Sequence, residues 1–163
     1  MRKELEQKLA EKYSFMRRQH TLAQQEAQGF IYDLYSAFGC ECSDGWYDLL
    51  DHLCEEIAQA YEAAGVPVNI VVDQVKEKYG TLRFYYHFSR QTPSIQTVEQ
   101  GTIRLKQDDS TLYQHMDAIV SKWEARSGSV CEMCGNAGEP RTDLLWILTL
   151  CDQCYQKQKT RRC

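Results

Sequence analysis

Residues 131–154 read CEMCGNAGEPRTDLLWILTLCDQC. They contain two C-x-x-C pairs, Cys131 with Cys134 and Cys151 with Cys154, which are sixteen residues apart. Because two intervening residues let both thiolates of a tight turn point to one side, two such turns face to face place four sulfurs around a metal ion, each at about 2.3 Å. Thiolates prefer zinc to the hard cations that seek oxygen. The spacing therefore predicts one zinc ion bound by four cysteines, with Gly135 in the left-handed conformation that closes the first turn.

A tetrahedral set of four cysteines leaves no open coordination position, so the predicted zinc ion is structural and not catalytic. Two other interpretations of the pairs are a redox dithiol and thiols buried by chance. The redox interpretation is disfavoured because it needs a single C-x-x-C pair on a βαβ scaffold, which this chain lacks. The apolar residues 144–150 between the pairs are expected to pack the element against the helix that carries Trp123.

The chain has 163 residues, of which 43% are hydrophobic and 26% charged. This composition is typical of a globular protein and excludes a disordered one, and the length fits one domain, alone or with a small metal-bound appendage. The apolar runs are too short to cross a bilayer, and the charged residues 1–13 do not resemble a signal peptide. We therefore expect a cytoplasmic protein whose eight cysteines stay reduced, so that the two C-x-x-C pairs indicate metal binding and not disulfides.

The charge distribution is uneven. The net charge is −4, which argues against a protein built to neutralise a nucleic-acid backbone. Residues 41–62 carry seven acids and neither Lys nor Arg, whereas the C-terminal tail is basic at Lys157, Lys159, Arg161 and Arg162. We interpret both stretches as solvated surface; the alternative is a tail that contacts nucleic acid or an acidic partner.

Periodicity predicts four helices, over residues 2–13, 21–28, 46–64 and from Asp109 or Ser110 to Gly128. Thr21 is expected to cap the second helix and Asp44 the third. The third helix has the clearest apolar face, formed by Trp46, Leu49, Leu50, Leu53, Ile57, Ala60 and Tyr61. Residues 30–42 fit either a strand or irregular packing.

Residues 69–77 and 81–88 predict a β-hairpin around Tyr79 and Gly80. In its second strand Leu82, Phe84, Tyr86 and Phe88 share one face, and Arg83, Tyr85 and His87 share the other. A two-residue turn would place Lys76 opposite Arg83, an unfavourable pair of like charges. We therefore expect a three-residue loop, which pairs Asp73 near Tyr85. A polar loop over 89–101 and a short strand over 102–106 follow.

These elements predict an α+β fold in which helices pack on a small antiparallel sheet, the hairpin 69–88, with a C-terminal element that resembles a zinc ribbon. Four parts are expected. They are an N-terminal helical segment (1–38), an α+β core (39–128), a zinc-binding element packed on the core (129–156) and a basic tail (157–163).

Two groups of residues are candidates for ligand binding. The first is Asp44 with Trp46, for which a helix cap and a core anchor are the simpler roles. The second is on the hairpin and comprises Lys76, Lys78, Arg83, Tyr85 and His87. Cations beside aromatic rings suit a phosphate-bearing nucleotide or an acidic peptide, and an exposed sheet face with extended side chains is the alternative.

Four further cysteines, Cys40, Cys42, Cys54 and Cys163, are expected to be small hydrophobic residues or surface thiols. A second metal site that combines Cys40 and Cys42 with His52 or Cys54 is disfavoured. Residues 52 and 54 lie about 200° apart on a helix, so their side chains do not converge on one ion.

Three segments resemble a family of small phage and prophage proteins. They are GCECSDGWYDLLDHLCEEI (39–57), QVKEKYGTLRFYY (74–86) and the cysteine pairs from Val130 to Asp152. The family pattern has C-G-D-G-W before an acidic helix, a V-K-E-K-(Y/F)-G-x-L-R-F-Y hairpin and C-x-x-C-G…T-L-C-x-x-H. Ser43 replaces a glycine of this pattern, and Cys154 replaces a histidine, which exchanges one metal ligand for another. The resemblance implies a viral accessory protein and no particular reaction.

Three functions remain open. The first is a non-catalytic phage accessory protein that binds a host protein or a nucleotide-type signal and counters host defence. The second is a regulatory zinc protein that binds nucleic acid. The third is a small nucleotide hydrolase, which is disfavoured because no nucleophile–base pair, open metal site or phosphate-binding loop is apparent. No catalytic residue is therefore assigned.

Overall fold

The computed structural model describes residues 1–89 and 109–160. Its helices are α1 (Lys3–Lys12), α2 (Leu22–Glu26), α3 (Leu34–Phe38), α4 (Tyr47–Ala63), α5 (Asp109–Ser127) and α6 (Asp152–Thr160), with short 3-10 turns η1 (Ser14–Met16) and η2 (Asp44–Trp46). Its strands are β1 (Cys40–Glu41), β2 (Ile70–Lys78), β3 (Thr81–Phe88), β4 (Glu139–Arg141) and β5 (Leu148–Leu150). The predicted α+β class is confirmed.

The main sheet has three strands in the order β1-β2-β3. The predicted hairpin forms its antiparallel part, and β1 adds a short parallel strand with Cys40 opposite Val75. The stretch 30–42, for which the sequence left two interpretations, is thus the helix α3 followed by a strand. The sheet is therefore mixed and not purely antiparallel as expected.

The hairpin register differs from the prediction. Tyr79 and Gly80 both have positive φ, 54° and 76°, so they form a two-residue turn of the type that matches the twist of the strands. Lys76 consequently lies opposite Arg83. A bulge between Val72 and Gln74 leaves Asp73 unpaired in the ladder, and Gln74 pairs with Tyr85 instead. The like-charge pair that the sequence argument avoided is therefore present.

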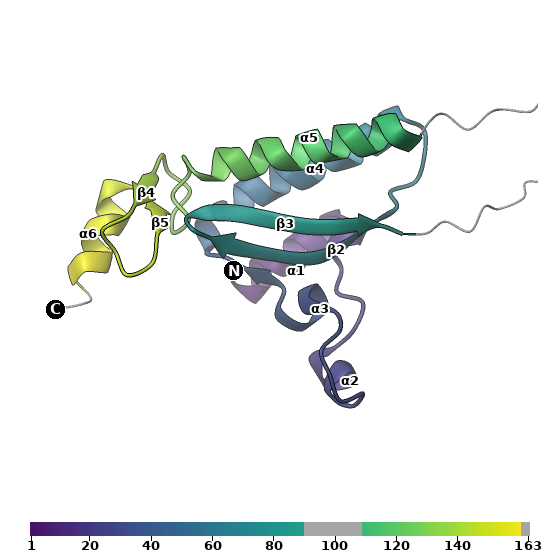
Figure 1. The fold of residues 1–163 in the computed structure, drawn as a ribbon, viewed down its shortest axis with the longest axis horizontal. Coiled ribbons are helices and arrows are strands. Elements are labelled where there is room, and N and C mark those ends of the chain that lie inside the picture. Colours follow the sequence, from purple (N-terminus) through teal and green to yellow (C-terminus); the bar gives the residue numbers. More distant parts are fainter. Residues whose placement is uncertain (90–108, 161–163) are drawn as a thin grey trace, which may run out of the picture.

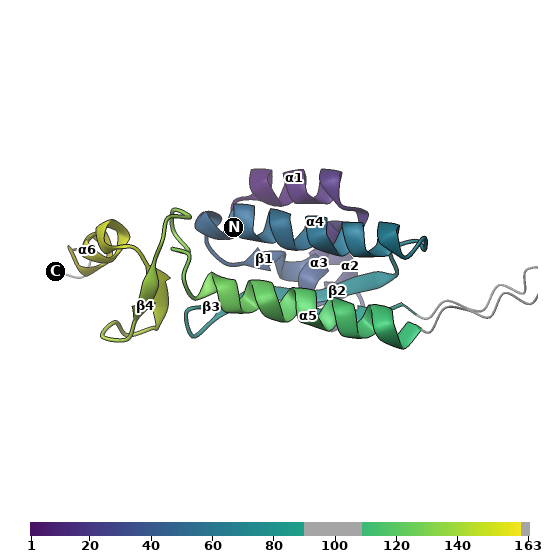
Figure 2. The same ribbon diagram turned by 90° about the horizontal axis from the view of Figure 1, so that it is seen from above.

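Helices α4 and α5 lie side by side over one face of the sheet (Figures 1 and 2). The core between them and the sheet contains Trp46, Leu50, Leu53 and Ile57 with Val75, Leu82, Phe84, Met116 and Ile119, all of which are buried. The predicted apolar face of α4 is thus correct. The opposite face of the sheet carries the polar side chains of β2 and β3.

Helix α5 also covers the free edge of β3. The backbone N–H of Leu82 donates to Oγ of Ser127 at 2.8 Å, and that of Phe84 donates to Oε1 of Glu124 at 2.8 Å. An uncovered edge of this kind would present unpaired N–H groups to other chains. The side chains of α5 satisfy these groups and end the sheet at β3.

The N-terminal segment packs α1 beside α4 (Figure 2) and α3 near β2, and it extends α2 away from the body (Figure 1). Thr21 caps α2 as predicted, in a reciprocal pair with Gln24. The buried side chain of Gln25 holds the following loop by accepting from the N–H groups of Tyr32 and Asp33 at 3.0 and 2.7 Å. This part of the chain therefore owes its shape to polar contacts more than to a core of its own.

Some predictions fall on residues outside the described part of the chain. They are the loop 89–101 beyond residue 89, the strand 102–106, and Arg161, Arg162 and Cys163; the side chains that were expected to cap α5, at 109 and 110, are not described either. The proposed basic tail is corrected in its first half, because Lys157 and Lys159 lie in the last turn of α6. Within residues 1–89 and 109–160, none of the helices has both the length and the hydrophobicity that crossing a membrane requires.

Candidate metal centre

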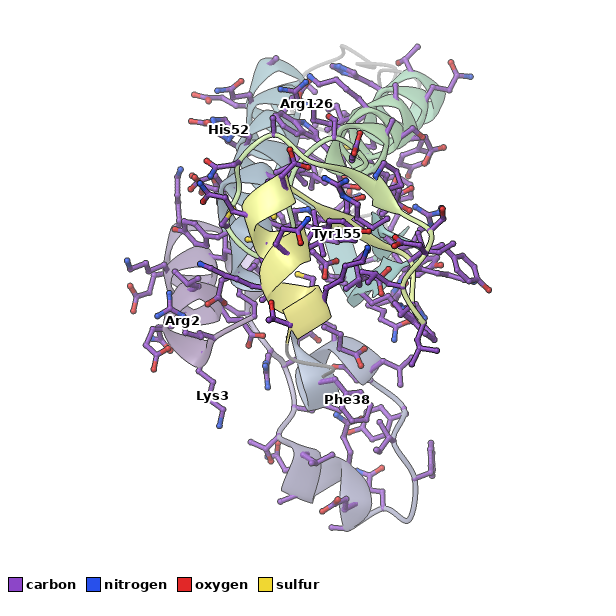
Figure 3. All side chains as sticks on the ribbon, turned by 90° about the vertical axis from the view of Figure 1, so that its left-hand side faces the viewer. Arg2, Lys3, Phe38, His52, Arg126 and Tyr155 are labelled. Atoms are coloured by element: carbon purple, nitrogen blue, oxygen red, sulfur yellow. The ribbon has the colours of Figure 1, made fainter. Side chains whose placement is uncertain are left out.

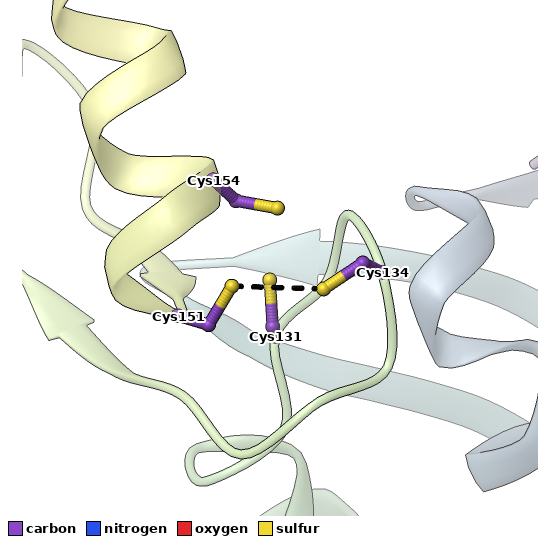
Figure 4. A group of neighbouring side chains, drawn as sticks. All are labelled: Cys131, Cys134, Cys151 and Cys154. Atoms are coloured by element: carbon purple, nitrogen blue, oxygen red, sulfur yellow. Dashed lines mark hydrogen bonds between the residues drawn. The ribbon is translucent and has the colours of Figure 1, made fainter.

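Four cysteine side chains converge where β5 and α6 meet the loop after α5 (Figure 4). The sulfur atoms of Cys131, Cys134, Cys151 and Cys154 all lie within 4.8 Å of one another, and those of Cys134 and Cys151 are 3.6 Å apart. A tetrahedral ion with bonds of about 2.3 Å needs sulfur separations of about 3.8 Å. The predicted ligand set is therefore brought together with the spacing that one thiolate-binding metal ion requires.

The first pair lies in a tight turn formed by residues 131–135, called here the first cysteine turn. The N–H of Gly135 donates to the carbonyl oxygen of Cys131 at 2.8 Å, and the N–H of Cys131 donates to the carbonyl of Asn136 at 2.7 Å. Gly135 has φ 79°, the left-handed conformation predicted for it. These backbone contacts hold the turn that carries both thiols.

The second pair lies at the start of α6, with Cys151 just before the helix and Cys154 in its first turn. The backbone N–H of Cys154 donates to the sulfur of Cys151 and lowers the pKa of that thiol to about 7. Burial and the neighbouring sulfurs raise the pKa of Cys154. Four sulfurs this close repel one another as thiolates, and a divalent cation removes that repulsion.

The cysteine element, residues 129–156, packs on η2 through Gly45. A Cβ at this position would collide with the carbonyl oxygen of Cys131 and the backbone nitrogen of Cys134, and it would lie 2.5 Å from the nitrogen of Gly135. The N–H of Gly45 donates to the carbonyl of Glu132 at 2.8 Å. Only glycine permits this backbone-to-backbone contact, a role that the sequence analysis did not assign to Gly45.

The neighbours of Gly45 have structural roles as well. Trp46 is fully buried, and its Nε1 donates to the carbonyl of Val130 at 2.8 Å, which ties the cysteine element to the core. Asp44 does not cap α4 as predicted, because α4 begins at Tyr47 without a side-chain cap. The carboxylate of Asp44 instead accepts from the backbone N–H of Arg2 at 2.8 Å and from its Nε at 2.5 Å, and the first of these bonds lowers the pKa of Asp44.

The hairpin turn provides a second contact to the cysteine element. Oγ1 of Thr149 donates to the carbonyl of Gly80 at 2.6 Å, and Nε1 of Trp146 donates to Oε2 of Glu77 at 2.8 Å. The apolar run 144–150 therefore meets the hairpin. We had expected it to pack against the helix that carries Trp123. Leu145 is 91% exposed, so part of the run faces solvent.

Glu132 lies between the two cysteines of the first cysteine turn, and the burial of its carboxyl group costs stability. Its side chain is 4% exposed, and its Oε2 has no hydrogen-bond partner among the described residues. Burial, together with the charge of Glu77, raises the pKa of Glu132 to about 7. Sequence reasoning missed this residue, since nothing in its neighbours marks a glutamate for burial.

The other described cysteines do not join the metal centre. Within the described residues, the four-cysteine cluster is the one group with metal-binding spacing. Cys40 and Cys54 are buried in the main core, and burial raises the pKa of the Cys40 thiol to about 12. These thiols behave as small hydrophobic side chains, as predicted.

The five hairpin candidates lie together on the sheet face opposite α4 and α5. We call Lys76, Lys78, Arg83, Tyr85 and His87 the outer sheet face. Nζ of Lys76 lies 5.5 Å from the centre of the Tyr85 ring. His87 pairs through Nδ1 with Oδ1 of Asp73 at 2.8 Å. Asp44 and Trp46, by contrast, are committed to Arg2 and Val130 and do not belong to this surface.

Comparison with protein-family models, with curated proteins and with solved structures finds no match.

Replacing Gly45 by Ala tests the contact between η2 and the first cysteine turn. We expect the metal-loaded protein to lose about 2–3 kcal/mol of unfolding free energy, because the added methyl group overlaps backbone atoms that cannot move independently. Urea unfolding measures the change. Gly128→Ala is the matched control, since its Cβ would meet the nearest atom at 3.5 Å, an ordinary contact. Equal stability of the two variants would contradict this packing.

Replacing Glu132 by Gln tests the burial of its carboxyl. The pKa is raised in the folded state, to about 7 from 4.5, so the folded protein holds the proton more tightly and stability falls as the pH rises through this range. We expect Glu132→Gln to be more stable than the parent by roughly 2–3 kcal/mol at pH 8, and the gain to shrink toward pH 5.5. Thermal unfolding across this range, with Glu62→Gln as the exposed control, checks it. A gain that does not vary with pH would show that the carboxyl charge is not its source.

Proposed function

We propose that the protein is a non-catalytic binding protein in which a structural zinc ion holds the C-terminal element, and in which the outer sheet face binds an acidic protein. The zinc assignment is supported by four thiolate ligands and by their spacing, which suit a tetrahedral thiolate site. With all four positions filled by cysteine, the ion offers no site for substrate or water. Its role is to fix the first cysteine turn against Gly45 and the start of α6 beside it.

The observation that carries the binding proposal is the pair of Lys76 and Arg83, directly opposite each other on β2 and β3. Like charges in this position cost stability, by up to about 1 kcal/mol. Within the described residues no carboxylate lies within ion-pair distance of Lys76, Lys78 or Arg83, although Glu41 on β1 lies opposite Lys76 in the parallel ladder. Proteins break such rules of stability mainly at functional sites, so the pair of like charges marks a candidate functional surface.

The chemistry of the outer sheet face selects the kind of partner. Lys76 lies beside the ring of Tyr85, which is 41% exposed, and Lys78 and Arg83 add two more cations to the same face. Arg and Tyr are enriched at the centres of protein interfaces, and a sheet face is flat enough to meet another protein over a wide area. Because the molecule as a whole has a net charge of −4, this cationic face directs an acidic partner to one orientation.

The family resemblance supports a phage accessory protein that acts in the cytoplasm of a bacterial host, with a host defence protein as the acidic partner. The contacts of the described histidines support a non-catalytic role. His52 bonds a backbone carbonyl, and His87 bonds Asp73, so neither is held against a nucleophile. The nucleic-acid alternative draws less support, because Lys159 and Arg141 are paired with Asp143 and Asp152.

Elemental analysis tests the zinc assignment. We expect about one zinc per chain, and a chelator is expected to lower the melting temperature because the bound ion contributes directly to folding. Cys134→Ser should lose the ion, whereas Cys42→Ser, which changes a cysteine outside the cluster, should keep it. A metal-free protein with an unchanged melting temperature in chelator would contradict the assignment.

Reversing one charge tests the outer sheet face. Arg83→Glu replaces the like-charge pair with an attractive one, so we expect equal or slightly higher stability, by about 0.5 kcal/mol, together with loss of partner binding. Affinity capture from bacterial lysate at low and high salt measures the binding. Lys157→Glu, on the distant helix α6, is the control and should retain the partner. Capture that survives Arg83→Glu would exclude this face, and salt-dependent retention of DNA by the parent would favour the nucleic-acid alternative.

A further inference from the structure

A second surface, which shares no residue with the outer sheet face, has the features of a small-molecule site. A cleft of about 250 Å³ opens between α4, α5 and the first cysteine turn. Its lining includes Asp48, Leu49, His52, Trp123, Arg126 and Val130. A hollow of about 400 Å³ lies next to it and shares Trp123 and Arg126. Ligand pockets are concave and combine apolar walls with a few polar groups, as the cleft and the adjoining hollow do together.

Two rings in the cleft are held in fixed positions. The rings of His52 and Trp123 are stacked, with centres 5.6 Å apart and planes 18° from parallel. Nε1 of Trp123 donates to Oε2 of Glu56 at 2.7 Å, and the same carboxylate accepts from Nζ of Lys122 at 2.6 Å. Nζ of Lys122 also lies 5.1 Å from the centre of the Trp123 ring, so the exposed ring of His52 is the one of the pair that offers another planar group a preorganised surface.

The hydrogen bond of His52 also determines which ring nitrogen is available. Its Nδ1 lies 2.6 Å from the carbonyl oxygen of Asp48, which only accepts, so Nδ1 carries a proton. In the neutral ring, Nε2 then keeps its lone pair as an acceptor. The backbone of α4 thus orients the ring without using the second nitrogen.

The cleft contains one cationic side chain, Arg126, and one anionic side chain, Asp48, and neither forms an ion pair with another described residue. Arg126 comes from the last turn of α5 and Asp48 from the first turn of α4. Neither side chain forms an ion pair within the described part of the chain. Figure 3, which views the molecule from the end with the cysteine element, shows His52 and Arg126 on the neighbouring helices α4 and α5.

The geometry points to a mononucleotide as the ligand of this cleft. A base matches the stacked rings of His52 and Trp123, and a 5′-phosphate matches the fork of donors on Arg126. The hydroxyl groups of the sugar or an exocyclic amine match the acceptors on Asp48 and on Nε2 of His52. A simple anion would use Arg126 alone and leave the rings and Asp48 without a role. This site is independent of the outer sheet face and of the protein partner proposed for it.

Calorimetric titration of the full-length, metal-loaded protein with the four common 5′-mononucleotides, AMP, GMP, CMP and UMP, tests the inference. We expect at least one of them to bind with a Kd between about 1 µM and 1 mM. Arg126→Gln should weaken that binding about tenfold or more by removing the charge-assisted bonds to phosphate. The corresponding nucleoside should bind the parent protein more weakly than the nucleotide by a similar factor.

Three controls separate the possible results. Arg83→Gln removes the same charge from the outer sheet face and should leave nucleotide affinity unchanged, which keeps a failure here distinct from a failure of the proposed protein-binding surface. Trp123→Phe, which keeps an aromatic ring, should weaken binding less than Trp123→Leu. Inorganic phosphate should compete poorly. Lack of binding by all four nucleotides at about 1 mM, binding that Arg126→Gln leaves intact, or phosphate that binds as tightly as the nucleotide would each overturn the inference.

Discussion

The close approach of the first cysteine turn to Gly45 is the contact on which the rest of the structure depends. The backbones of residues 131–135 and of η2 meet where any other side chain would intervene. Trp46 extends the contact by donating to Val130 while its ring fills the core under α4. Because these residues are about ninety positions apart in sequence, their contact joins the N-terminal half of the fold to the cysteine element. A metal ion that fixes the turn at one side therefore also stabilises the start of α4 at the other.

The hairpin that carries the outer sheet face is held by two other elements, the cysteine element and helix α5. The cysteine element meets the hairpin turn through Thr149 and Trp146, which holds the strands of the outer sheet face from one end. Helix α5 holds β3 along its edge through Ser127 and Glu124. With the hairpin fixed from two sides, the like charges of Lys76 and Arg83 stay side by side, and the sheet face remains open. These contacts thus keep the repulsion between Lys76 and Arg83 in place, whereas an isolated hairpin would relieve it by shifting its register.

Much of the fold and of the metal site follows from local patterns in the sequence. Amphipathic spacing located α1, α4 and α5, alternation located β2 and β3, and two C-x-x-C pairs identified four ligands. Errors arose where tertiary contacts outweighed local preference. The predicted hairpin register was wrong because Tyr79, with positive φ, completes a two-residue turn, and because a bulge at Asp73 shifts the pairing beyond it. Asp44 was wrongly predicted to cap a helix, because its actual partner, Arg2, lies far away in the sequence.

By itself the sequence determined the class of the fold, the four cysteines that could hold a metal ion and the polar side of the hairpin, because each depends on neighbouring residues whose spacing matches a helix, a strand or a turn. Only the tertiary structure decided that Gly45 lies against the cysteine turn, that Oε2 of Glu132 is buried without a hydrogen-bond partner among the described residues, and that His52, Trp123 and Arg126 share a cleft. These features join residues from separate elements. Their positions are set by how the helices pack across the sheet, and no local pattern of residues encodes that packing.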